Sequence, residues 1–234
     1  MSGLRDNVAL ACRALARAGL ATGSLGHVSA RVAADRVAIR CRGRHDTGLL
    51  FTTPDAVREI DPADPAPDPD WRVPHELAIH SAFYRARPDV GAVVHVHPPA
   101  AVLAGLAGLE LRPVFGAFDI PAARLALAGV PVFPRAALVT RAELGEELVA
   151  AAGGADVCLM RGHGITTVGP TVAAAFARAL ELERLAAITL DLARIGAKPD
   201  VLTDADRAEL PDLGAAFDDG LVWAHHQALD ALTS

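Results

Sequence analysis

Residues 87–98, RPDVGAVVHVHP, are the most informative about the architecture of this chain. Their centre, residues 91–96, is a short apolar run between turn residues, which predicts a buried strand. Residues 75–87 are predicted to form a helix, because Pro74 stands at its start and Pro88 lies just beyond its end. A helix that leads directly into a buried strand is typical of a layered α/β domain.

The same alternation of helix and strand continues on both sides of this stretch. Predicted helices cover residues 4–19, 141–152 and 171–195, and predicted strands cover residues 37–41, 49–52, 111–115, 130–133, 156–160 and 165–168. The chain shows no internal repeat and no low-complexity linker. This pattern predicts one layered α/β domain. A domain of 234 residues can bury a sufficient core without disulfide bonds or a structural metal.

Composition and charge exclude several classes of protein. Hydrophobic residues make up 52% of the chain and charged residues 21%, which is typical of a globular protein and not of a disordered one. The net charge is −6 and no run of Lys or Arg forms a basic stripe, so we expect no nucleic-acid partner. No apolar stretch approaches the roughly 18 residues of a membrane helix, and the N-terminus lacks the order of a signal peptide. We therefore expect a soluble, cytoplasmic protein with no membrane partner.

The cysteines and the single lysine limit the kinds of reaction that this chain can catalyse. Cys12, Cys41 and Cys158 are far apart and odd in number, which is typical of buried thiols in a reducing compartment. Lys198 is the only lysine, and it lies in a polar, turn-like segment. A Schiff-base enzyme needs a buried lysine whose pKa is lowered. Carbonyl chemistry in this chain is therefore predicted to depend on a metal.

Three histidines provide the strongest functional signal. His95 and His97 are two residues apart on the predicted strand, so their side chains point to the same face. They lie at the carboxyl end of that strand, where α/β sheets bind ligands. His163 lies between two glycines, which let the backbone turn sharply. Three imidazoles leave a coordination position of a metal open for substrate, and Glu76 is predicted to be a fourth ligand or a general acid/base.

Four segments of the chain resemble the class II aldolase/adducin family. They are residues 23–31 (GSLGHVSAR), 74–80 (PHELAIH), 87–98 and 161–164 (RGHG), in the family's order and spacing. The resemblance covers about residues 5–195. It implies an α/β fold in three layers, with a central, mainly antiparallel or mixed sheet flanked by helices.

The resemblance also implies a metal site and an assembly. By matching motif positions, His95, His97 and His163 become the ligands of one divalent metal ion per subunit, and Glu76 becomes the acid/base. Zinc is the metal of the aldolases, while manganese, iron or cobalt also suit histidine ligands. The family further implies a homotetramer with active sites at the subunit interfaces.

The C-terminal tail is expected to be distinct from the rest. We predict a class II aldolase/adducin-like catalytic domain over residues 1–200. Residues 201–234 would form an extension that packs on this domain or on a neighbouring subunit. The tail carries Trp223, His225 and His226, which would either cover a pocket or belong to a structural helix.

The chain departs from the sugar-phosphate aldolases of this family where those enzymes hold phosphate. They carry Asn in the glycine-rich segment where this chain has His27, and Ser-Ser before the glutamate where it has Pro74 and His75. Pro74 offers neither a hydroxyl nor an N–H group. These differences favour the decarboxylase branch of the family, which acts on acids such as dihydroxyphthalate or carboxylated hydroxymuconic semialdehydes. Residues 111–121 and 159–164 also resemble that branch.

The predicted activity is a metal-dependent lyase reaction that decarboxylates a hydroxy-substituted aromatic or ring-derived carboxylic acid. Glu76 or His75 would protonate the carbon from which carbon dioxide leaves. Two alternatives remain open. One is a class II aldolase for a hydroxy-carbonyl or sugar-phosphate substrate, and the other is a non-catalytic, adducin-like assembly module.

Several residues are expected to bind the small carboxylate substrate. They are His27, Ser29, Arg31, Thr53 and Arg161. Glycines bring the backbone near His27 and Ser29 close to a ligand, and guanidinium groups bind carboxylates in a bidentate manner. The loop at residues 42–45, Arg-Gly-Arg-His, is a further candidate carboxylate clamp. His80 lies one helical turn after Glu76, where it would orient that residue or serve packing.

Overall fold

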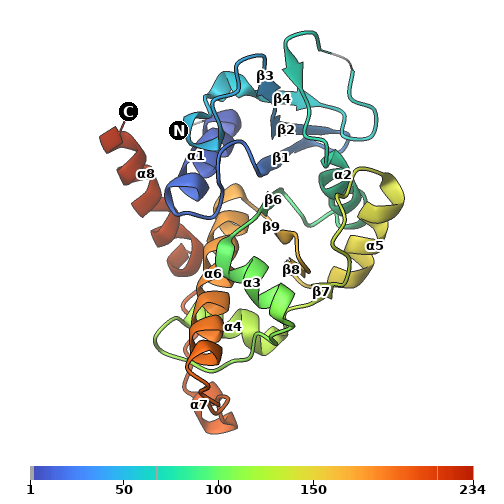
Figure 1. The fold of residues 1–234 in the computed structure, drawn as a ribbon. Helices are drawn as coiled ribbons and strands as arrows, with labels where there is room; N and C mark the ends of the chain where they lie inside the picture. Colours follow the sequence, from blue (N-terminus) through green and yellow to red (C-terminus); the bar gives the residue numbers. More distant parts are fainter. Residues whose placement is uncertain (1–2, 67, 215, 234) are drawn as a thin grey trace.

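The computed structural model describes residues 3–66, 68–214 and 216–233. A seven-stranded sheet lies at its centre, in the order β4-β2-β1-β6-β9-β8-β7 (Figure 1). The strands are β1 (His27–Ala33), β2 (Arg36–Arg40), β4 (Val57–Ile60), β6 (Ala92–Val96), β7 (Val132–Phe133), β8 (Val157–Met160) and β9 (Gly164–Gly169). Neighbouring strands pair antiparallel except β7 and β8, which pair parallel. The predicted mixed, mainly antiparallel sheet flanked by helices is confirmed.

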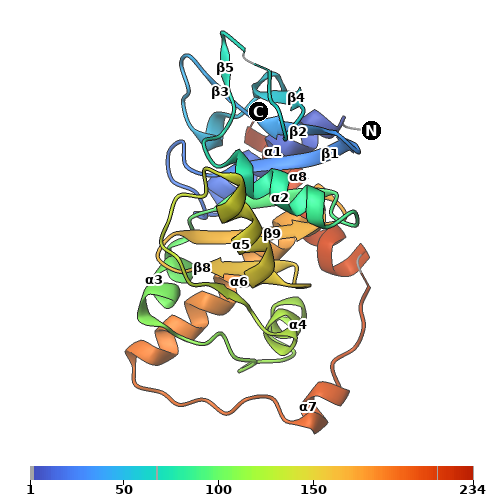
Figure 2. The same ribbon diagram turned by 90° about the vertical axis from the view of Figure 1, so that its right-hand side faces the viewer.

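Helices cover both faces of this sheet (Figure 2). The helices of the described residues are α1 (Leu4–Arg17), α2 (Leu77–Ala86), α3 (Pro99–Ala107), α4 (Ile120–Ala128), α5 (Ala142–Ala152), α6 (Val172–Arg194), α7 (Asp204–Ala208) and α8 (Leu221–Thr233). One face of the sheet packs against α1, α3 and α6, and the other packs against α2 and α5. None of the helices in the described part of the chain is long and apolar enough to span a membrane.

The central strand β6 explains how the two layers meet. Its side chains alternate between the two faces, so Val94 and Val96 join the core under α1 and α6, while Val93 joins the core under α2 and α5. His95 therefore shares the face of Val93, on the side of α2. The imidazole of His95 therefore points toward α2, the helix that begins directly after Glu76.

The structure departs from the sequence-based expectation in two segments. Residues 49–52 were expected as a strand, but Leu49–Phe51 form a short 3-10 helix, η1. The Thr52 hydroxyl closes this turn by donating to the Leu49 carbonyl over 2.8 Å. Residues 111–115 form no strand either. Their central Pro113 has no N–H group for a ladder of hydrogen bonds. The other predicted helices and strands are present, and their ends differ only slightly from expectation.

A small second sheet lies beyond the edge of the first. Strand β3 (Arg42–Gly43) pairs antiparallel with β5 (Trp71–Arg72), and this ribbon forms part of the upper region in Figure 1. Two short helical turns, η1 and η2 (Pro54–Ala56), connect β3 to β4. The ribbon places basic side chains near the start of α2.

The C-terminal helix α8 packs against α1 and α6 of its own chain. The Asp230 carboxylate pairs with Arg13 and, over 2.8 Å, with Arg17. The Trp223 ring lies 5.6 Å from the ring of Phe176, centroid to centroid. These contacts give Trp223 a packing role. The boundary at residue 200 stays a prediction.

Candidate metal centre

Four side chains from three parts of the chain converge on one point. Glu76 lies immediately before α2, His95 and His97 come from the end of β6, and His163 lies in the turn between β8 and β9. One ligand atom from each residue lies within 4.8 Å of the ligand atoms of the other three. The three imidazole centroids are 4.9 Å apart in every pair. The structure thus brings together all of the residues that were predicted around a metal.

Glycines make this convergence possible. Gly162 has a φ of +65°, which allows the tight turn that presents His163. A Cβ atom on Gly164 would lie only 2.3 Å from the Val96 carbonyl oxygen and 2.7 Å from Cδ2 of His97. Only a residue without a side chain allows β9 to approach the end of β6 this closely.

Glu76 is buried, and its two oxygens have different surroundings. Oε1 accepts a hydrogen bond of 2.9 Å from the backbone N–H of Val139. Oε2 lies 3.4 Å from Nε2 of His95 and 3.4 Å from Nε2 of His163. Burial alone would raise the pKa of Glu76, but the neighbouring imidazoles of His163 and His95 outweigh this effect and lower the pKa. Glu76 is therefore a carboxylate whose Oε2 atom faces the histidines.

His95 and His97 have lowered pKa values, which favour the neutral form that metal ligation requires. Burial lowers the pKa of His95 more than the neighbouring Glu76 raises it. Burial, together with the other two imidazoles, lowers the pKa of His97 to about 4. Nδ1 of His95 lies 3.3 Å from Oγ1 of Thr166, whose hydroxyl donates to the sulfur of Met160. Oγ1 of Thr166 therefore accepts a hydrogen bond from the Nδ1–H group of His95, which leaves Nε2 of His95 free to face the centre.

The residues present fit a divalent metal ion. Both ring nitrogens of His163 are buried without a hydrogen-bond partner among the described residues. Nε2 of His95 lies 3.0 Å from Nε2 of His97, and the closest carboxylate–imidazole distances are 3.4 Å. Ligands around a tetrahedral zinc ion are about 3.3 Å apart, because each lies about 2.0 to 2.1 Å from the metal. Such an ion would give Nε2 of His163, which faces the centre, the partner that a buried polar atom requires.

A buried chain of hydrogen bonds lies directly behind this centre. His27 pairs with His95 across β1 and β6, with ring centroids 5.0 Å apart. Nδ1 of His27 lies 2.6 Å from Nε2 of His80, and Nδ1 of His80 lies 2.6 Å from Oγ of Ser29. The Ser29 oxygen lies 2.7 Å from the Tyr84 hydroxyl. His27 and Ser29 thus lie in a buried chain of hydrogen bonds that ends at Tyr84, and their substrate-binding role stays a prediction.

Arg31 lies in a different environment from the one expected of a substrate ligand. Its guanidinium group donates to the backbone carbonyls of Val90, Tyr84 and Arg87 over 2.9 to 3.1 Å. It also stacks over the Tyr84 ring, 4.7 Å from the centroid. These contacts join β1 to the segment between α2 and β6, so we leave Arg31 out of the proposed substrate site.

Thr53 and Arg161, which were expected to bind substrate, and His75, which was expected to be catalytic, line separate cavities. Thr53 is exposed and lines a cavity of about 210 Å³ together with Trp71. Arg161 lines a cavity of about 410 Å³ together with Arg112. His75 is exposed and lines a cavity of about 640 Å³ with three arginines. Only the last of these three cavities is lined by a residue next in sequence to one of the four converging residues, because His75 precedes Glu76.

Some functional contacts could not be found in the sequence. Thr166 lies opposite His95 in the pairing of β6 with β9, so only the strand register reveals it. The Val139 N–H group that holds Glu76 belongs to a loop without a motif. Arg72 lies opposite Arg42 in the β3–β5 ribbon, a pairing that the sequence did not indicate.

Comparison with known proteins identifies related chains. The model of the class II aldolase and adducin N-terminal domain matches residues 6–190. A 3,4-dihydroxyphthalate decarboxylase of Arthrobacter keyseri is 44% identical to this chain, over 97% of this chain and 94% of that protein. A 3,4-dihydroxyphthalate decarboxylase of Rhodococcus jostii (strain RHA1) is 46% identical, over 97% of this chain and 96% of that protein.

A solved structure supports the fold independently. The L-fuculose 1-phosphate aldolase from Glaciozyma antarctica PI12 superposes with a TM-score of 0.77, over 97% of this chain and 90% of that chain. Its sequence is only 18% identical. This likeness shows that the layered arrangement described above is shared at low sequence similarity.

Proposed function

This chain belongs to the class II aldolase and adducin family, and from that membership we propose that it decarboxylates 3,4-dihydroxyphthalate or a closely similar hydroxylated aromatic dicarboxylic acid. Its relatives over nearly the whole chain make it a carbon–carbon lyase. The observation that carries the proposal is the convergence of Glu76 with the imidazoles of His95, His97 and His163.

His95, His97 and His163 would hold the metal ion, and Glu76 would complete the set or act beside it. A divalent metal bound there would supply a Lewis acid for a hydroxyl oxygen of the substrate. We propose zinc, because three imidazole ligands and one open position suit its preferred ligand types and coordination number in catalytic sites. Loading with manganese, iron or cobalt in place of zinc, followed by activity measurement, tests this choice.

Glu76 is proposed to move the proton that the reaction needs. Its lowered pKa keeps it ionised, so Oε2 can accept a proton from a ring hydroxyl of the substrate. Oε2 then returns the proton to the ring carbon that carries the departing carboxylate. The bond between that carbon and the carboxylate breaks, carbon dioxide leaves, and the ring keeps the proton in its place. The hydrogen bond from the Val139 N–H to Oε1 holds the carboxylate in position for both transfers.

We further propose a homotetramer in the cytoplasm with active sites at subunit interfaces. Large apolar side chains are exposed at Leu106, Phe118 and Leu138, which offers apolar surface for subunit contacts. The three cysteines are free and buried, in keeping with a reducing compartment. Light scattering on the purified protein tests the assembly. Truncation after residue 200 tests the proposed division into a catalytic domain and an extension.

The deciding experiment is carbon dioxide release from 3,4-dihydroxyphthalate by metal-reconstituted protein. A chelated sample and a Glu76→Gln variant serve as negative samples, and a His225→Ala variant, changed on the exposed side of α8, serves as the matched control. The proposal expects metal-dependent release that Glu76→Gln lowers by a factor of about 100 or more. Release of an aldehyde from sugar phosphates without carbon dioxide would support an aldolase instead. No reaction with either substrate and no bound metal would support an assembly module.

A further inference from the structure

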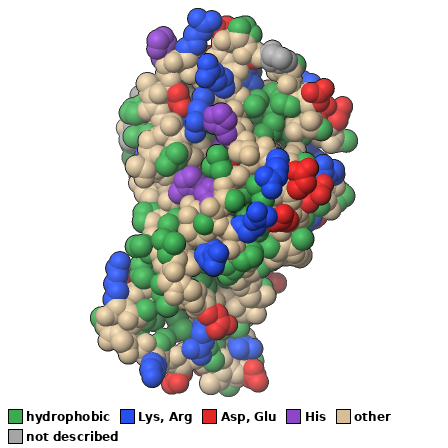
Figure 3. All heavy atoms as spheres, turned by 45° about the vertical axis from the view of Figure 1, so that its right-hand side comes forward, with side chains coloured by type: hydrophobic (Ala, Val, Ile, Leu, Met, Phe, Trp, Pro, Cys, Tyr) green, Lys and Arg blue, Asp and Glu red, His purple; other side chains and the backbone are tan. Residues whose placement is uncertain are grey.

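A cavity of about 640 Å³ is lined mainly by the β3–β5 ribbon and its flanking residues, and also by His75. Arg42, Arg44 and Arg72 contribute three positive charges to its lining, and His75 contributes an exposed imidazole. On the face shown in Figure 3, basic and histidine side chains gather over the upper half of the molecule. His75 immediately precedes Glu76 in the sequence, so the cavity and the proposed metal centre are connected through adjacent residues.

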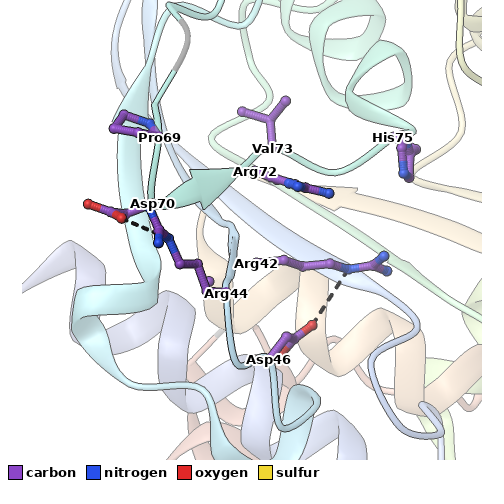
Figure 4. Close-up of a pocket in the computed structure, with 9 residues that line it drawn as sticks. Arg42, Arg44, Asp46, Pro69, Asp70, Arg72, Val73 and His75 are labelled. Atoms are coloured by element: carbon purple, nitrogen blue, oxygen red, sulfur yellow. Dashed lines mark ion pairs between the residues drawn. The ribbon is translucent and has the colours of Figure 1, made fainter.

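Arg42 and Arg72 lie directly opposite each other on the two strands of the ribbon. Like charges in this position repel each other and destabilise a strand pair. Figure 4 shows that both side chains nevertheless extend in the same direction, toward the side on which His75 lies. An anion between the two guanidinium groups would remove this repulsion.

Nearby carboxylates neutralise this pair only in part. Asp46 lies 3.7 Å from Nε of Arg42, and it also pairs with the buried Arg40. Asp70 pairs with Arg44 over 3.1 Å, on the outer side of the ribbon. No acidic side chain in the described ranges lies within ion-pair distance of Arg72. The positive charge of Arg72 is therefore available to a ligand.

We propose that Arg42 and Arg72, together with His75, bind the carboxylate that the substrate keeps. This inference rests on the proposed function, because an aromatic dicarboxylic acid loses one carboxylate as carbon dioxide and retains the other. Guanidinium groups bind carboxylates through paired, charge-assisted hydrogen bonds. The retained carboxylate carries the same charge before, during and after the reaction. Its binding therefore affects substrate affinity and leaves the chemical step unchanged.

Steady-state kinetics of Arg72→Gln test the proposal. We expect KM for 3,4-dihydroxyphthalate to rise about tenfold while kcat changes by less than about threefold, since one charge-assisted contact is lost from a partly exposed site. Arg72→Lys keeps the charge but loses the paired hydrogen bonds. Its KM should therefore lie between the KM of the unchanged protein and that of Arg72→Gln. Arg85→Gln removes an exposed arginine from α2 and is the control for loss of one charge.

Binding measurements separate this inference from the proposed function. Calorimetry with phthalate, an unreactive dicarboxylate, reports on the cavity even in protein that releases no carbon dioxide. Weaker phthalate binding by Arg72→Gln but not by Arg85→Gln supports the carboxylate site, whether or not turnover occurs. An unchanged KM and unchanged phthalate binding in Arg72→Gln would overturn it. So would phosphate binding as tightly as phthalate, or a loss confined to kcat.

Discussion

The Nδ1 atom of His27 shares one proton with the Nε2 atom of His80 across 2.6 Å, directly behind the proposed metal centre. Burial lowers the pKa of His80 to about 3, so its ring is neutral and carries a single N–H group. If that group faces His27, the other ring nitrogen must accept from Ser29. The position of one proton on His80 then sets the donor and acceptor in each hydrogen bond as far as Tyr84.

Ser29→Ala is expected to destabilise the protein by about 1 to 3 kcal/mol. The change leaves Nδ1 of His80 buried without its partner, and an unsatisfied buried polar atom costs about this much. Urea unfolding measures the difference. Ser81→Ala, which removes a partly exposed hydroxyl bonded to the Ala78 carbonyl over 3.3 Å, is the matched control. Equal losses of unfolding free energy in the two variants would contradict a stabilising role for this chain of hydrogen bonds.

The metal-free protein should lose stability as the pH falls from about 6.5 toward 4. Folding lowers the pKa of His80 from 6.5 to about 3, so in this window the unfolded chain binds a proton that the folded chain excludes. The stability contributed by neutral His80 is complete above the unfolded pKa. This stability falls by up to about 1.4 kcal/mol for each pH unit below the unfolded pKa.

Two residues of the proposed metal centre act in the same direction as His80. The pKa of His97 is lowered to about 4, and the pKa of Glu76 is lowered below its usual 4.5, so its contribution is lost as the pH falls further. Urea unfolding of chelated protein between about pH 7.5 and pH 5 measures the slope. His80→Gln should have a shallower slope, and a stability independent of pH over this range would refute the prediction.

His97→Ala is expected to lower the affinity for the metal by at least about 100-fold, because even partners one step removed from a metal contribute 10- to 100-fold. Elemental analysis after dialysis against a weak chelator measures the retained metal. His225→Ala, which removes an exposed imidazole on α8, should retain as much metal as the unchanged protein. Full retention by His97→Ala would mean that the imidazoles serve another purpose.

Gly164→Ala should cost about 1 to 3 kcal/mol and weaken metal binding at the same time. The new Cβ atom would lie 2.3 Å from the Val96 carbonyl oxygen, so β9 or the end of β6 must shift. The same atom would meet Cδ2 of His97 at 2.7 Å, which displaces a proposed ligand. Gly154→Ala, where a Cβ atom meets nothing within 4 Å, is the control for both measurements.

The sequence predicted the centre better than its surroundings, for physical reasons. Two histidines on one strand share a face because strand geometry has a period of two, so His95 and His97 could be placed without a structure. His163 was marked by the glycines on both sides of it. Arg31 could not be separated from the other arginines, because its partners are backbone carbonyls, which leave no pattern in the sequence.

The fold shows the same division between local and non-local information. The apolar run of β6 and the long helix α6 were predicted from their own residues. Strand β1 was recognised only as a glycine-rich motif, because its place beside β6 depends on pairing with distant residues. The two segments wrongly predicted as strands are apolar, but one contains Pro113 and the other is closed into a turn by Thr52. Apolar content alone could not distinguish these outcomes.

The position of β6 between β1 and β9 has a consequence for how the chain assembles during synthesis. The pairs β1–β2 and β8–β9 join strands that are close in sequence, whereas β6 joins these two hairpins across long stretches of chain. Such long-range pairing forms more slowly than local pairing. The side chains proposed to bind the metal lie at this junction, so a nascent chain acquires the complete set only after β9 has been made. Metal uptake would then report that the two halves of the sheet have joined.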